Sequence, residues 1–420
     1  MNEYTNDRAD TTERTDTIER FIEQIYRILP DLPESLREPL EEKLNDAFGP
    51  FLNKRPPRVM LMGRRGAGKS TFLNAMFGHQ VQAVGSVTAQ TGQAAWQTFK
   101  VGKRTLDILD TRGLQEGSTP DESDSAATAS ESVKRAIKEQ RPDIVLFLCK
   151  AKEVDAAIHG DLAATEAVLR EATGLLDQRI PLIGVVTQVD ELSPSRVKRL
   201  PTDNEEKNAN IQAATTLLRK HLESNKYLQK SLIEVIPTAA YAHLNEDGTF
   251  DDTRDYRWNM DHFMDRLLEH LPLEAQVVIV GPAKTLALQK HLANKLVFAC
   301  SAACGLVAGQ PIPIADMPIL TAIQGAMVAM IAYISGREVN AKTVTEFITA
   351  LGANVAIAYS LREAVRWFSK LVPVAGNLAS AAVASQATNA LGKAAIAYFI
   401  DKKDVSAVRE MMKGALKREG

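Results

Sequence analysis

RVMLMGRRGAGKSTFLNAMFG, residues 58–78, places a glycine-rich turn between an apolar run and an amphipathic run. Gly63, Gly68, Lys69 and Ser70 fit the spacing G-x-x-x-x-G-K-[ST]. The glycines allow backbone N–H groups of the turn to point inward around phosphate oxygens, and the following helix adds the positive end of its dipole. The stretch therefore predicts a strand, a phosphate-binding loop and a helix, in that order.

The chemistry of this loop assigns roles to its residues. Lys69 is expected to bridge the β and γ phosphates of a nucleotide, and the Ser70 hydroxyl is expected to bind Mg²⁺. The residues expected to surround the phosphates are Gly63, Arg64, Gly66, Ala67, Gly68, Lys69, Ser70 and Thr71.

Outward from the loop, short apolar runs alternate with longer amphipathic ones. The apolar runs are RVMLM, AAWQTFKV, TLDILD, DIVLFLC, PLIGVVT and SLIEVIPT. This alternation is typical of a mostly parallel sheet with helices on both faces, and it extends over residues 56–272. We therefore expect an α/β domain there.

The flanking segments have a different pattern. Residues 1–16 are polar and predict a disordered lead-in, whereas residues 17–55 carry apolar positions at helical spacing, interrupted by PDLP. We expect GPFLNKRPP to end this helical segment. Residues 273–420 show no strand pattern and predict a carboxyl-terminal helical domain.

Two further strand ends carry polar residues suited to a nucleotide. LDILDTRG places the Asp110 carboxylate beside Mg²⁺ and the Gly113 N–H beside the γ-phosphate. LIGVVTQVD ends in Thr187, Gln188 and Asp190, and the Asp190 carboxylate can accept two hydrogen bonds from guanine. Adenine lacks that pair of donors, so a carboxylate here selects guanine.

A third strand end completes the predicted base site. VIPTAAY places Thr238 and Ala239 at the end of the last strand. The backbone of Ala239 or Ala240 is expected to cover the guanine carbonyl oxygen.

This ordered set of motifs resembles the GTPases of the Era, TrmE and septin-like group, over about residues 58–272. GKSTFLNAMFG is similar to the GKSTLLNALLG that recurs in that group. The resemblance implies a Ras-like P-loop GTPase domain that binds GTP and Mg²⁺ and hydrolyses GTP to GDP and phosphate. One departure is T-Q-V-D in place of N-K-x-D, which puts Thr187 for Asn and the shorter, uncharged Gln188 for Lys. A weaker affinity for guanine is the expected consequence.

The second departure concerns catalysis. Leu114 follows D-x-x-G, where Ras-like GTPases carry a glutamine that orients the attacking water. An arginine of the loop is therefore a candidate for stabilising charge in the transition state, within one chain or across a homodimer, with Arg65 ahead of Arg64. Either arginine could instead face solvent or pair with a carboxylate. The expected catalytic set is Lys69, Arg65, Thr91 and Gly113.

The resemblance also implies a mobile threonine that closes over Mg²⁺. GSVTAQTGQ offers Thr91, which has the spacing from Lys69 found in Era-like GTPases, with Thr88 as the alternative. The expected Mg²⁺ ligands are then Ser70, Thr91 and Asp110.

The carboxyl-terminal half resembles an uncharacterised helical domain fused behind Era-like GTPase domains, through PIPIADMPILTAIQGAMVAMIA and ALGKAAIAYF. Between Leu296 and Gly336 the only charged residue is Asp316. Gln324 interrupts the apolar run that comes nearest to the 20 or so residues of a membrane span. Two alternatives stay open, a helical bundle in water and a bundle that contacts a membrane through residues 296–400.

Composition restricts the class of protein. The net charge is −2 and the sequence pI is about 6.4, so no overall positive field favours nucleic acid. The three cysteines lack metal-ligand spacing, and the polar amino terminus is unlike a signal peptide, which predicts a cytoplasmic protein, free or at the inner face of a membrane. The expected function is a GTP-hydrolysing switch acting on a helical effector domain. The alternatives are a self-assembling mechanoprotein like the dynamins and immunity GTPases, and a GTP sensor that does not hydrolyse.

Overall fold

The computed structural model describes residues 18, 21–64, 66–77, 82–83, 96–101, 104–110, 129–155, 158–176, 179–245, 249–283, 286–309, 316–337, 339, 343, 346–347, 351 and 381–417. The chain forms two compact units, a sheet unit of Arg55–Ala283 and a helical unit of Met1–Lys54 with Lys284–Gly420. The sequence predicted a division after residues 55 and 272. Helix α8 (Leu273–Ala283) instead clusters with the sheet unit.

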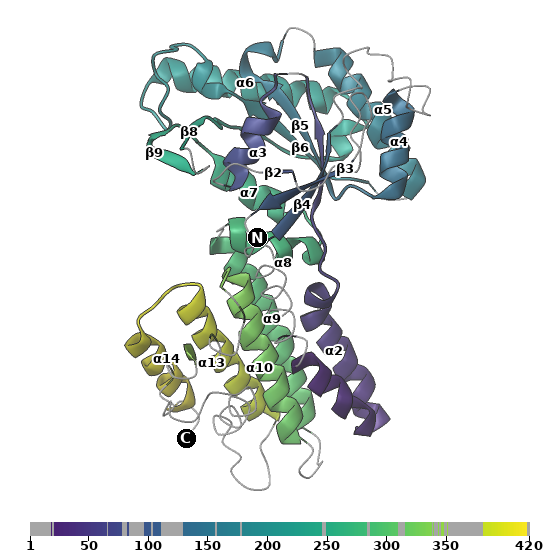
Figure 1. Ribbon diagram of the computed structural model, residues 1–420, viewed down its shortest axis with the longest axis vertical. Helices are drawn as coiled ribbons and strands as arrows, with labels where there is room; N and C mark the ends of the chain where they lie inside the picture. The colour runs from purple at the N-terminus through teal and green to yellow at the C-terminus, as the bar shows by residue number, and fades with distance from the viewer. Residues whose placement is uncertain are drawn as a thin grey trace, which may run out of the picture. The chain divides into compact units, whose positions relative to one another are not determined.

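The sheet unit is built on a seven-stranded sheet in the order β2-β3-β4-β1-β5-β6-β7 (Figure 1). Strands β4, β1, β5, β6 and β7 are parallel, and β2 and β3 add an antiparallel edge. The strands are β1 (Arg58–Met62), β2 (Gln82–Ala83), β3 (Trp96–Val101), β4 (Arg104–Asp110), β5 (Ile144–Lys150), β6 (Leu182–Thr187) and β7 (Leu232–Pro237). The mostly parallel sheet predicted from the sequence is confirmed.

Helices cover both faces of this sheet, as predicted. On one face, Val133, Leu169 and Leu218 pack in a single core with Met60 and Phe147 of the strands. They belong to helices α4 (Ala129–Glu139), α5 (Ile158–Leu176) and α6 (Glu205–Ser224). Alternate residues of a strand point to opposite faces, so β1 and β5, buried on both faces, read as continuous apolar runs.

The other face is covered by α3 (Lys69–Phe77) and α7 (Met260–Glu269). Phe72 of α3 and Phe263 of α7 are both fully buried and meet edge to face, with ring centroids 4.8 Å apart. The packing of Phe72 fixes the helix that begins at Lys69, and it therefore fixes the loop before that helix.

Residues 242–255 form a hairpin that the sequence pattern did not predict. Strands β8 (Ala242–Leu244) and β9 (Phe250–Asp255) pair antiparallel, outside the main sheet. The sequence FDDTRD is almost entirely polar, so it carries no apolar alternation by which a strand could be recognised.

The helical unit places the amino-terminal helices beside carboxyl-terminal ones. Its helices include residues 21–28, α2 (Glu34–Leu52), α9 (Leu286–Ala308), α10 (Asp316–Ile334), α13 (Ala381–Phe399) and α14 (Val405–Lys417). Helix α9 packs against α2, α10 and α13 (Figure 1). The Phe21 ring lies directly against Gly325 of α10, where any side chain would collide with it. This contact joins the amino-terminal helix of residues 21–28 to α10 in one core.

Helix α2 ends inside GPFLNKRPP, the stretch expected to end it. Its last turn runs through Pro50 to Leu52. Proline removes one backbone donor, and in the last turn the loss is small because the Asn53 N–H still closes the turn on the Gly49 carbonyl. Phe48 and Phe51 are buried and hold this final turn in place.

Among the described residues, one helix is long and apolar enough to cross a membrane by length and composition. This helix is Leu286–Ala308, and 56% of its apolar window is buried within the protein. Core helices of this length meet the same criteria, so the helix is weak support for a membrane span.

Candidate functional site

The loop between β1 and α3 has the backbone of a phosphate cradle. Gly63, Gly66 and Gly68 all have positive φ angles, of 133°, 80° and 85°, in a region that residues with a side chain rarely adopt. At Gly63 there is also no space, because a Cβ atom would collide with the Leu148 carbonyl oxygen of β5. Glycine at these positions is therefore required by the path of the loop.

Lys69 lies inside this loop. Its side chain is buried, and Nζ donates hydrogen bonds to the carbonyl oxygens of Gly63, at 2.5 Å, and Arg64, at 3.3 Å. The ammonium group is thus held over the loop by its own backbone. Ser70 and Thr71 follow on the first turn of α3, where both are exposed.

Arg64 is held by an ion pair with α5. Its Nε donates to Asp161 Oδ2 at 2.7 Å, and the Asp161 side chain is only 12% exposed. Burial raises the pKa of the Asp161 carboxyl, and the nearby Arg64 guanidinium opposes that rise. The structure therefore gives Arg64 a carboxylate partner, one of the two alternatives that the sequence left open.

Thr187 connects the end of β6 to the phosphate loop. Its hydroxyl is buried and donates to the Ala67 carbonyl oxygen at 2.9 Å, with the Cys149 carbonyl oxygen 3.4 Å away. Ala67 is itself buried at the centre of the loop. One hydroxyl therefore joins the segment expected to bind the base to the segment expected to bind the phosphates.

Gln188 also reaches the phosphate loop. Its backbone is left-handed, with a φ of 57°, and its Nε2 donates to the Gly66 carbonyl oxygen at 3.2 Å. The turn directs the side chain back toward Gly66 and Gly68. The amide therefore lies against the loop, although it carries no charge.

Asp190 lies in a short 3-10 helix, η4 (Val189–Glu191), and its side chain is largely buried. Burial is the main cause of the raised pKa of its carboxyl. Lys207 of α6 holds this segment in place, because its Nζ donates hydrogen bonds to the carbonyl oxygens of Asp190, at 2.7 Å, and Leu192, at 2.6 Å. The Lys207 side chain is fully buried, and burial lowers its pKa.

No sequence pattern pointed to Lys207 as a residue of the site. A lysine in the first turn of a polar helix is ordinarily exposed, so nothing in the pattern marks it as buried. The preceding Asn204 caps α6, accepting from the Lys207 N–H at 2.8 Å, and this cap aims the lysine at the loop after β6.

Thr238 and Ala239 follow β7 and are completely buried. The Thr238 carbonyl accepts from the Val189 N–H at 3.3 Å, and the Ala239 backbone pairs with Trp258. The ends of β6 and β7 are therefore joined beside Asp190.

The expected Mg²⁺ ligands are only partly within the described residues. Asp110 is the last residue of β4 and lies in register with Leu61 of β1, so it ends at the same sheet edge as the phosphate loop. Ser70 is the second residue of α3, which begins at that edge. An oxygen-rich pair beside phosphates fits Mg²⁺, which takes few protein ligands there. Arg65, Thr88, Thr91, Gly113 and Leu114 lie outside the described residues.

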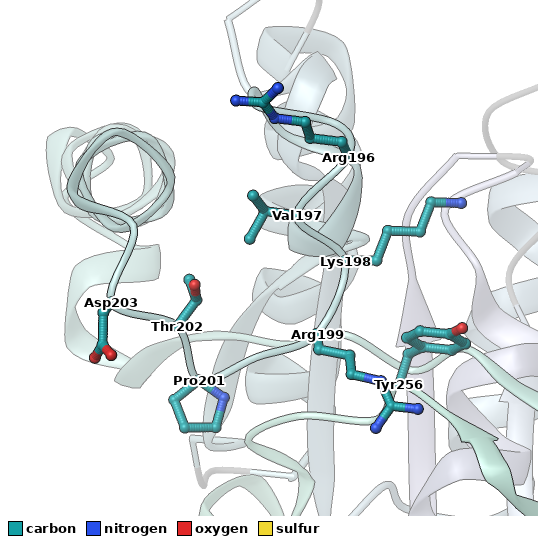
Figure 2. Close-up of a pocket in the computed structure, with 8 residues that line it drawn as sticks. All are labelled: Arg196, Val197, Lys198, Arg199, Pro201, Thr202, Asp203 and Tyr256. Atoms are coloured by element: carbon teal, nitrogen blue, oxygen red, sulfur yellow. The ribbon is translucent and has the colours of Figure 1, made fainter.

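A separate shallow pocket of about 600 Å³ lies in the loop after Asp190 (Figure 2). Its lining is Arg196, Val197, Lys198, Arg199, Pro201, Thr202, Asp203 and Tyr256. The Arg199 guanidinium lies 5.5 Å from the Tyr256 ring centroid, beneath the ring in Figure 2. None of the described residues of the phosphate loop lines this pocket. Burial is the main cause of the raised Asp190 pKa, and the Lys198 charge opposes that rise slightly.

Comparison with known proteins identifies the fold of the sheet unit. Residues 58–187 match the family model described as 50S ribosome-binding GTPase. These residues form a P-loop GTPase domain. The match to the family model ends before the helical unit, so the resemblance of the carboxyl-terminal half to a helical domain stays a prediction.

Curated relatives match the same part of the chain. The uncharacterised protein YkfA of Escherichia coli K12 is 28% identical over 174 residues, which are 41% of this chain and 54% of that protein. The tRNA modification GTPase MnmE of Methylococcus capsulatus is 28% identical over 132 residues, 31% of this chain and 25% of MnmE. The chain thus spans about half the length, or less, of these two relatives.

Two solved structures resemble part of this chain. Toc33 of Arabidopsis thaliana, in complex with GDP and Mg²⁺, is 16% identical with a TM-score of 0.33, over 58% of this chain and 94% of Toc33. Era of Aquifex aeolicus is 19% identical with a TM-score of 0.29, over 62% of this chain and 69% of the Era chain.

Proposed function

We propose that the chain is a GTP-binding and GTP-hydrolysing switch whose nucleotide state controls its helical unit. The observation that carries the proposal is the joining of phosphate loop and base segment: Thr187 Oγ1 binds the Ala67 carbonyl, and Asp190 lies three residues further on. A nucleotide with its phosphates on the loop would therefore present its base to the Asp190 carboxylate.

The residues of the loop supply the binding chemistry. Lys69 provides a buried ammonium that can leave the Gly63 and Arg64 carbonyls for phosphate oxygens, and such charge-assisted bonds are strong. Ser70, Asp110 and Thr91 would hold Mg²⁺, which when bound neutralises charge on the phosphates. Asp190 would accept from guanine, with Thr238 and Ala239 packed beside it.

The proposed hydrolysis needs a source of transition-state charge other than a glutamine, because Leu114 stands after D-x-x-G. Arg65 is the proposed source, acting within one chain or across a homodimer. Arg64 is bound to Asp161 and is the weaker candidate. Control of the helical unit would pass through the chain itself, which crosses between the two units near residues 54 and 284.

Turnover measured at rising protein concentration tests this proposal. A slow rate per molecule that does not change with concentration supports a switch that acts within one chain, whereas a rate that climbs supports catalysis across a homodimer or a larger self-assembly. Lys69→Ala should abolish hydrolysis, and Lys134→Ala on the outer helix α4 is the matched control that should not. If the wild type shows no turnover at any concentration, the chain is not a hydrolysing switch. A GTP sensor that does not hydrolyse would then be the remaining alternative.

A further inference from the structure

Lys150, the last residue of β5, lies against the phosphate loop. It pairs in register with Thr187 of β6, so both residues end at the same edge of the sheet. A methyl group added at Gly66 would meet Lys150 Nζ at 3.2 Å and Cε at 3.5 Å. The end of the lysine side chain therefore runs along Gly66.

Gln188 approaches Gly66 from the next strand. Its Nε2 binds the Gly66 carbonyl oxygen at 3.2 Å, and the same nitrogen would lie 3.3 Å from a methyl group added at Gly68. Gly66 is therefore flanked by an ammonium group from β5 and by a neutral amide from the segment after β6. Of these two, only the ammonium can contribute a full positive charge to an anion on the loop.

We propose that Lys150 is a nucleotide-binding residue that supplies the cation missing from T-Q-V-D at Gln188. The inference rests on the proposed function. A phosphate group held by the loop backbone would lie next to Gly66, within reach of Lys150 Nζ. A hydrogen bond from an ammonium to a phosphate oxygen is roughly twice as strong as one between neutral groups.

Lys150 has another partner, and this supplies a control. Its Nζ lies 3.1 Å from the Glu153 carboxylate, and the Lys150 side chain is 28% exposed. If the lysine served only this ion pair, removing either member would have the same effect. If Lys150 binds nucleotide, Glu153 competes with the phosphates for its charge, and Glu153→Gln should keep or improve nucleotide affinity.

Calorimetric titration of the full chain with GDP and Mg²⁺ tests the inference. Lys150→Gln should weaken GDP binding by about tenfold, the typical effect of one charge-assisted hydrogen bond, and Glu153→Gln should not weaken it. The double variant Lys150→Gln/Gln188→Lys places a lysine where N-K-x-D has one, and it should recover most of the lost affinity. Thermal unfolding of each variant without nucleotide separates binding effects from effects on folding.

The outcomes separate this inference from the function on which it rests. A wild type that does not bind GDP removes the proposed function and the inference with it. A wild type that binds GDP, with Lys150→Gln binding equally well, overturns the inference alone. Equal losses of GDP affinity in Lys150→Gln and Glu153→Gln would show that Lys150 acts only through its ion pair with Glu153. If Lys150→Gln/Gln188→Lys does not recover affinity, Lys150 does not replace the cation that T-Q-V-D lacks at Gln188.

Discussion

The Thr187 hydroxyl lies 2.9 Å from the Ala67 carbonyl oxygen, across 120 residues of sequence, and donates a hydrogen bond to it inside the protein. The bond fixes the distance between the segment that carries Asp190 and the phosphate loop. A nucleotide bound to both would have to match that distance, so we expect the bond to prepare the proposed site before any ligand arrives.

Thr187→Val should weaken GDP binding by about tenfold, because valine keeps the shape and leaves the Ala67 carbonyl without its donor. Thr215→Val is the matched control, since Thr215 Oγ1 is also buried and donates to a carbonyl within α6. Calorimetry should show GDP affinity reduced in the first variant and unchanged in the second. Equal affinity in both would show that the Thr187 bond does not prepare the site.

Asp143 holds the chain as it enters β1. Its side chain is 4% exposed and forms two hydrogen bonds with Arg55, at 2.6 and 2.7 Å, and a third with the Arg58 N–H. Asp143→Asn should lower the free energy of unfolding by about 2 kcal/mol, since buried charged hydrogen bonds are lost. Glu171→Gln, in the half-exposed pair with Lys134, should cost less than about 1 kcal/mol. Urea denaturation compares the two, and similar losses would contradict the ranking.

The raised pKa of Asp190 should make the proposed guanine binding sensitive to acid. The carboxyl must be ionised to accept from guanine, and burial moves its protonation to a higher pH than that of an ordinary aspartate. GDP affinity should therefore fall as the pH drops, starting above the range in which an unperturbed aspartate titrates. The ratio of wild-type to Asp190→Asn affinity cancels the titration of the phosphates, and this ratio should shrink on acidification. A ratio independent of pH would exclude Asp190 as the guanine acceptor.

The same shift affects stability. Because the folded pKa is above the unfolded value, the folded state binds more protons between the two values. The contribution of Asp190 to the free energy of unfolding therefore rises as the pH falls through that window. This is opposite in sign to the usual salt-bridged aspartate.

The two loop arginines should differ in their effect on hydrolysis. Arg65→Ala is expected to lower kcat by about 10² to 10³, because an arginine that stabilises developing charge acts mainly in the transition state. Arg64→Ala should lower it by less than about tenfold, since the ion pair with Asp161 holds that guanidinium at α5. Single-turnover rates at saturating GTP compare them. If Arg65→Ala hydrolyses GTP as the wild type does, the catalytic charge comes from another group.

Local pattern was sufficient for the phosphate loop and for every strand of the main sheet except β2, which no apolar run marked. Each apolar run from RVMLM onward became a strand, and β6 ends at Thr187 because the next residue adopts a left-handed turn. Gly63 could be recognised because the loop motif requires glycine, and the structure adds the reason, its contact with Leu148.

Contacts between distant residues could not be predicted in this way. The Arg64 partner Asp161 lies 97 residues away, and Phe21 of the amino-terminal segment contacts Gly325 of α10. Lys207 is buried because α6 packs against the segment that carries Asp190. The residues next to Lys207 in the sequence do not indicate this packing. Pattern shows which face of a helix is apolar, but it does not show which helix will cover that face.

Base selectivity is the most direct test of the account, because it depends on the phosphate loop and on Asp190 together. Calorimetric titration of the wild type with GDP and with ADP, both with Mg²⁺, should show GDP binding at least about 100-fold tighter, since adenine leaves the buried Asp190 carboxylate without donors. Asp190→Asn should remove that preference and favour xanthosine diphosphate. Equal binding of ADP and GDP by the wild type, or binding of neither, would contradict the central claim that this chain is a guanine-nucleotide switch.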